Sequence, residues 1–122
     1  MSDEIRLTNR PIRVTATGSQ DLEDVLDVLA YDRLDLYLQV YSLEGTSPSV
    51  VVTVETSMQN ESDDNNLWHN LVTFGTISAS NDSDKQSATS GVLRYIRWRV
   101  TTLSGTGTPA ATFIIHGVGR RN

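Results

Sequence analysis

Apolar and polar residues alternate along much of this chain, with the period of a β-strand that buries one face. The clearest run, residues 34–41, places Leu34, Leu36, Leu38 and Val40 on one side and Asp35, Tyr37, Gln39 and Tyr41 on the other. Residues 49–58 repeat the pattern, with Val50, Val52 and Val54 on one face. We predict strands over these two segments and over residues 67–74, 92–101 and 111–118.

Turn-forming residues separate the predicted strands. Residues 44–48, Glu-Gly-Thr-Ser-Pro, lie between the first two strands, which we therefore expect to form a hairpin. The Gly- and Thr-rich residues 104–109 connect the last two strands in the same way. The polar stretches 59–66 and 78–91 are predicted to be loops, and the second is long enough to be functional or to be ordered by a partner.

The N-terminal region gives weaker signals. Residues 5–7 and 12–16 are predicted to be short strands, and Pro11 between them excludes a central strand at that point. Residues 21–30 carry apolar side chains at helical spacing, yet 25–28 also suit a short strand, so both structures stay open. We expect residues 1–20 to form an extended arm that contacts a partner, and deletion of residues 1–17 to leave the remaining fold intact.

Length and composition favour one all-β domain. The 122 residues fit a single domain, and Thr, Val and Ile supply 32 of them against 12 for Ala, Glu and Lys. Six to eight strands with turn signals between them favour an antiparallel β-sandwich of jelly-roll type over residues 21–122. The absence of cysteine excludes disulfides, Cys-ligated zinc and thiol catalysis. No segment has the apolar length of a signal peptide or a membrane span, so no membrane association is expected.

Charge is divided unevenly along the sequence. All 15 acidic residues lie at or before Asp84, where the net charge is −11, and the remaining residues carry +6. Nine of the ten basic residues are arginine, which suits planar contacts with carboxylates at protein interfaces. Direct nucleic-acid binding is disfavoured because the acidic first part would repel a duplex.

One predicted strand, residues 92–101, directs Ile96, Trp98 and Val100 to the core. Its outward side chains are Tyr95, Arg97 and Arg99. These arginines either form ion pairs with the acidic part of the same domain or face a neighbouring subunit. We infer a partner-binding role for the arginines and one tyrosine outside the core: Arg6, Arg10, Arg13, Tyr95, Arg97, Arg99, Arg120 and Arg121.

Candidate chemistry is sparse. The chain has no Gly-x-Ser-x-Gly nucleophile motif. His69 follows Trp68 in an apolar predicted strand and His116 lies in the last one, so both are interpreted as packed or surface side chains. The oxygen-rich residues 60–65 lack the spacing of a calcium loop. We therefore expect no catalytic residues, no metal and no cofactor. Trp68, Tyr37 or Tyr41 stacking on a sugar ring is the alternative, as in a carbohydrate-binding module.

Several segments resemble small jelly-roll head decoration proteins of tailed bacteriophages. They are Tyr31-Asp32-Arg33-Leu34-Asp35-Leu36, Leu43-Glu44-Gly45-Thr46, Glu55-Thr56-Ser57-Met58 and Leu93-Arg94-Tyr95-Ile96-Arg97-Trp98-Arg99-Val100 with Ala111-Thr112-Phe113-Ile114-Ile115. The resemblance covers residues 21–119 and is carried by strand patterns. It implies a non-enzymatic cement protein, often trimeric, made in the host cytoplasm and bound to the major capsid protein on the outside of the virion. A neck, tail or fibre-attachment protein on the same sandwich is a further alternative.

Overall fold

The computed structural model describes residues 2–121, and nearly all of its regular structure is β-strand, as predicted. The strands are β1 (Ser2–Arg6), β2 (Ile12–Val14), β3 (Gly18–Ser19), β4 (Leu26–Asp27), β5 (Arg33–Ser57), β6 (His69–Thr73), β7 (Asp82–Ala88) and β8 (Tyr95–Arg120). Two short 3₁₀ turns, η1 (Leu22–Asp24) and η2 (Asn65–Leu67), lie between them. No helix in this part of the chain is long and apolar enough to cross a membrane.

Two very long strands, β5 and β8, organise the molecule. They pair antiparallel from Arg33 opposite Arg120 to Ser57 opposite Tyr95. β1, β2, β3 and β4 follow one another along the other side of β8, while β7 and β6 occupy the other side of β5. The chain thus crosses the molecule in four antiparallel passes: β1 to β4 form the first, β5 the second, β6 with β7 the third and β8 the fourth. Across the sheet these passes lie in the order first, fourth, second, third.

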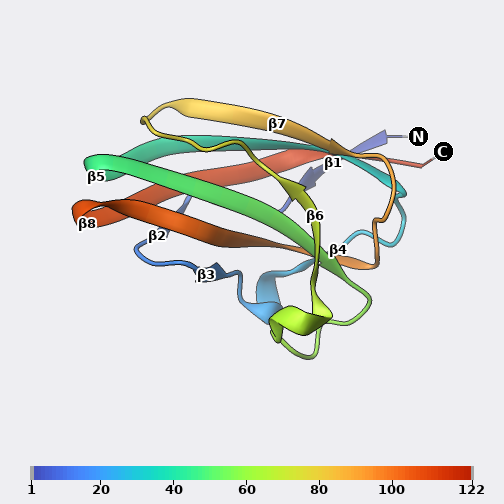
Figure 1. Ribbon diagram of the computed structural model, residues 1–122. Coiled ribbons are helices and arrows are strands. Elements are labelled where there is room, and N and C mark those ends of the chain that lie inside the picture. The colour runs from blue at the N-terminus through green and yellow to red at the C-terminus, as the bar shows by residue number, and fades with distance from the viewer. Residues whose placement is uncertain (1, 122) are drawn as a thin grey trace.

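All four passes fold over near their middle, which gives a β-sandwich-like molecule of two facing layers (Figure 1). One layer holds β1, β2, β7, residues 33–44 of β5 and residues 110–120 of β8. The other layer holds β3, β4, β6, residues 49–57 of β5 and residues 95–104 of β8. The core lies between the layers, where the rings of Trp98 and Phe113, from the two halves of β8, pack edge to face with their centres 5.3 Å apart.

The two predicted hairpins are wrong. Residues 34–41 and 49–58 do not pair with each other, because β5 runs through the turn sequence 44–48 and enters the other layer. β8 does the same at residues 104–109. The turn residues serve a bend that two paired strands share: Gly45 and Gly105 both have positive φ, and a Cβ on Gly105 would lie 3.1 Å from Cα of Pro48.

The alternating faces were predicted correctly. Every inward residue of the 34–40 run is fully buried, as are Val50, Val52, Val54 and Ile96. The stretch 78–91, predicted to be a loop, instead contains β7, which pairs with residues 34–40 of β5. β7 is an edge strand whose side chains are mostly exposed, so the sequence shows no apolar face; only Ala88 is buried.

The extended N-terminal arm is not confirmed. Residues 2–6, 12–14 and 18–19 are strands of the sheet, and Ile5 and Leu7 are buried in the core. Removing residues 1–17 would therefore open the core. Residues 21–30 do not form a helix: they contain the short turn η1 and the two-residue strand β4, which lies within the segment 25–28 that was considered as a short strand.

Candidate functional site

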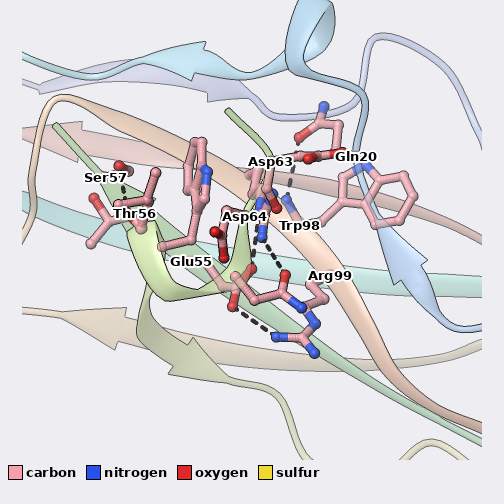
Figure 2. A network of polar contacts seen from close by, with 12 residues as sticks. Gln20, Glu55, Thr56, Ser57, Asp63, Asp64, Trp98 and Arg99 are labelled. Atoms are coloured by element: carbon pink, nitrogen blue, oxygen red, sulfur yellow. Dashed lines mark hydrogen bonds and ion pairs between the residues drawn. The ribbon is translucent and has the colours of Figure 1, made fainter. Parts of the chain in front are cut away.

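Arg97 is buried, with none of its side chain exposed, and its guanidinium joins a polar network to which Glu55 and Arg99 also belong. Figure 2 labels Glu55 and Arg99 and, beside them, Asp63 and Asp64 of the loop that follows β5. Its Nε donates to Oε1 of Glu55 at 2.9 Å, across the pair of strands that carries both residues. Its terminal nitrogens donate to the backbone oxygen of Asp63 at 3.3 Å and to Oδ1 of Asn65 at 3.0 Å. The prediction that Arg97 faces a partner is therefore wrong, and the alternative of an ion pair within the domain holds.

The loop between β5 and β6, residues 58–68, folds back onto the sheet through this network. The Arg97 guanidinium lies 4.5 Å from the centre of the Trp68 ring, whose Nε1 donates to the backbone oxygen of Ser62 at 2.9 Å. The hydroxyl of Ser57 donates to the oxygen of Leu67 at 2.7 Å. Because Trp68 is buried, its ring cannot stack on a sugar, so this part of the carbohydrate alternative fails.

Two other predicted residues of the same strand also make contacts within the domain. Arg99, about one third exposed, donates to Oε2 of Glu55 at 3.3 Å. Tyr95 is half-buried and lies under the guanidinium of Arg94, 5.1 Å from the ring centre. The outward side of the β8 strand 95–99 is thus covered by the chain's own loop and side chains.

Arg10 and Arg13 border a cavity of about 570 Å³ at the edge of the sandwich, where the first pass leaves β8. Arg13 pairs with Glu44 at 3.3 Å, whereas Arg10 has no hydrogen bond or ion pair within residues 2–121. The buried Gln20 holds the walls together: its side-chain amide nitrogen donates to the backbone oxygens of Leu7 and Asp24, and its Oε1 accepts from the backbone N–H of Trp98. We call this region the edge groove.

A second surface is the outward side of the layer that contains β7, β5, β8 and β1. Pairing places Arg6, His116, Tyr37 and Lys85 side by side across the four strands. The neighbouring rows bring the outward residues Glu4, Asp35, Arg33 and Arg120. Unlike the other layer, this surface is not covered by a loop: Tyr37 is 40% exposed and Tyr41 39%. We call it the open face.

One end of the open face carries a cluster of charges around Asp35. This carboxylate accepts hydrogen bonds from the Ser87 hydroxyl at 2.6 Å and from Nε of Arg120 at 2.9 Å, and Arg33 lies at 3.4 Å. The Ser87 and Arg120 hydrogen bonds lower the pKa of Asp35 to about 2. Arg33 and Arg120 therefore share the carboxylate of Asp35, and Nε of Arg33 is buried without an acceptor.

The remaining predicted residues lie at the margins of these surfaces. Arg6 pairs with Glu4 at 2.9 Å, and the ion pair lowers the pKa of Glu4. Arg121 is exposed just beyond β8. Within the described residues no three His, Asp or Glu side chains are arranged to hold a metal ion.

The structure therefore divides the eight predicted site residues into three groups. Arg97, Arg99 and Tyr95 pack against the loop, Arg10 and Arg13 border the edge groove, and Arg6 and Arg120 lie on the open face with Arg121 near it. The sequence did not predict that Lys85 and Tyr37 lie next to each other on neighbouring strands, because Lys85 was in a segment predicted to be a loop. No protein-family model matches the chain, and no curated protein matches it either.

Proposed function

We propose that the chain is a non-enzymatic structural protein of a bacteriophage virion, a decoration protein that binds the outer surface of the head and stabilises it. The observation that carries this proposal is the presence of two separate arginine-bearing surfaces, the edge groove and the open face, on one paired-strand sandwich. A decoration protein needs one surface for the capsid and one for neighbouring subunits. Its partners are then the major capsid protein and further copies of itself, with a trimer as the favoured oligomer.

The strand order supports the finer fold assignment that we propose, a sandwich of jelly-roll type. Four antiparallel passes in the order first, fourth, second, third, folded over together so that each contributes a segment to both layers, follow the strand order expected of an eight-stranded jelly roll. The N-terminal residues 7–20 keep a role in this proposal, as the wall of the edge groove. The capsid contact is assigned to Arg10 and Arg13.

Gradient sedimentation with phage particles tests the proposal. The chain is expected to sediment with DNA-filled particles at a copy number near that of the major capsid protein. Replacing both groove arginines, Arg10→Glu with Arg13→Glu, should abolish sedimentation with particles. The control Arg94→Glu reverses an exposed arginine that lies outside the groove and should leave sedimentation with particles unchanged.

The other results have definite meanings. Copy numbers near a dozen per particle would assign the chain to the neck or tail instead. Recovery only in the soluble fraction would refute a virion role.

A carbohydrate-binding module is the second candidate, and the exposure of Tyr37 and Tyr41 favours it. Tyrosine rings on a flat sheet can stack on sugar rings. A glycan array tests this candidate: reproducible binding that Tyr37→Ala removes, with the fold intact, would support it. Trp68→Ala is unsuitable because it would release the loop from Arg97.

A further inference from the structure

The open face carries positive charge on a chain that is negative as a whole. Its outward side chains include four cations, Arg6, Arg33, Lys85 and Arg120, and two carboxylates, Glu4 and Asp35. The face therefore has a net charge of +2 when His116 is neutral. Since the whole chain carries −5, the rest of the molecule carries −7.

Both carboxylates of the open face are already bonded. Glu4 accepts from Arg6, and Asp35 accepts from Arg120 and Ser87. Lys85 is exposed and makes no side-chain hydrogen bond or ion pair within residues 2–121, and the Arg33 side chain, which shares Asp35 with Arg120, is 41% exposed. Donors are thus in surplus on this face, which suits a partner that brings carboxylates.

The chain itself exposes uncompensated carboxylates on its opposite side. Asp21, Glu23 and Asp24 around η1 and Glu61, Asp63 and Asp64 in the loop 58–68 are all exposed and take part in no ion pair within the described part of the chain. Asp21, Glu23 and Asp63 line one shared depression. Figure 1 shows η1 and η2 together, on the side of the sandwich away from β7. We call these six residues the acidic end.

We propose that the open face binds the acidic end of a second copy of this chain. This inference deepens the homo-oligomer part of the proposed function. Charge excludes one arrangement of the two copies: two open faces meeting each other would bring together two surfaces of +2, whereas the open face and the acidic end attract. Repeated head to tail around an axis, this contact between unlike surfaces closes into a ring, as a trimer requires.

Tyr37 is the anchor of this contact. It stands in the middle of the cationic row, between His116 on β8 and Lys85 on β7, and its ring is 40% exposed. Tyrosine and arginine are the residue types that contribute most at protein interfaces. A tyrosine between an imidazole and an ammonium group offers a rigid apolar surface and hydrogen-bond donors at one place.

Sedimentation velocity of the purified chain tests the proposal. The wild type should associate at about 0.05 M salt and weaken at about 0.5 M, where the Debye length falls to a few ångströms. The open-face variant, Arg6→Glu with Lys85→Glu, and the acidic-end variant, Glu23→Lys with Asp63→Lys, should each raise the dissociation constant at least about tenfold. Combining all four substitutions in one chain should restore association, because the two surfaces have exchanged sign.

Controls separate this inference from the proposed function. The groove variant, Arg10→Glu with Arg13→Glu, makes the same change in net charge as the open-face variant and should remain oligomeric while it loses particle binding. Circular dichroism confirms that each variant is folded. A monomeric wild type at low salt, an open-face variant that still associates, or a folded four-substitution variant that stays monomeric would each overturn the inference, whatever the particle assay shows.

Discussion

Replacing Arg97 by methionine tests how much of the stability depends on the buried polar network. The substitution keeps the approximate length and apolar stem of the side chain but removes the charge. Glu55 is then left buried, and the backbone oxygen of Asp63 and the side chain of Asn65 lose a donor. Removing one partner of a buried ion pair costs about 3–5 kcal/mol.

The structure places the expected loss at the lower end of this range, about 3 kcal/mol. Arg99 still reaches Oε2 of Glu55 at 3.3 Å, so the carboxylate keeps one cation. The double variant Glu55→Met with Arg97→Met removes both buried charges. It should be more stable than Arg97→Met alone by at least about 1 kcal/mol, because no uncompensated charge remains in the interior.

Urea unfolding followed by tryptophan fluorescence and circular dichroism measures these differences. Release of the loop should also shift the Trp68 emission to longer wavelength before global unfolding. The matched control is Arg94→Met, which breaks the exposed pair with Asp27 and should cost at most about 1 kcal/mol. If Arg97→Met costs no more than this control, Arg97 is not the residue that holds the loop, and the reasoning fails.

Three further predictions concern other parts of the sandwich. The folded pKa of Asp35 lies near 2, below its unfolded value, so its contribution to stability is present above about pH 4 and is lost as the pH falls towards 2. As the pH is lowered over this range, the melting temperature should therefore fall less steeply in Asp35→Asn than in the wild type; equal slopes would contradict the role assigned to Asp35. Gly117→Ala should destabilise by at least about 2 kcal/mol in urea, because its Cβ would clash with the backbone oxygen of Asp35, whereas Gly75→Ala, with only an ordinary contact, is the control. Gln20→Ala should cost about 1–3 kcal/mol by leaving buried backbone groups of the edge groove unpaired, and a loss within the error of the urea measurement would show that water replaces the amide.

Strand faces could be predicted from this sequence because burial imposes a period of two on side chains. Leu34 to Val40 and Val50 to Val54 were placed correctly for that reason. The pairing of strands could not, because Gly45 and Pro48 are equally compatible with a hairpin and with a bend shared by two strands. The choice between them depends on where Gly105 and Pro109 lie in space.

The candidate site was predicted in part, and the failures have physical reasons. Arg97 was assigned to the surface because charged residues are seldom fully buried without a partner. Its partner Glu55 lies 42 residues away, and alternation alone does not show that the loop 58–68 returns over both. Lys85 was missed because an edge strand needs no apolar face.

The position of β8 as the last strand determines when the protein can fold during its synthesis. β5, β6 and β7 can pair as soon as residue 88 has left the ribosome, but the other edge of β5 and the entire first pass wait for β8. At about 5–20 residues per second, residues 58–120 take roughly 3–13 s to synthesise. Over that time the leucine-rich strand from Leu34 to Val40 lacks its central neighbour, so chaperone binding to the nascent chain is expected to centre on this segment until β8 closes the sheet.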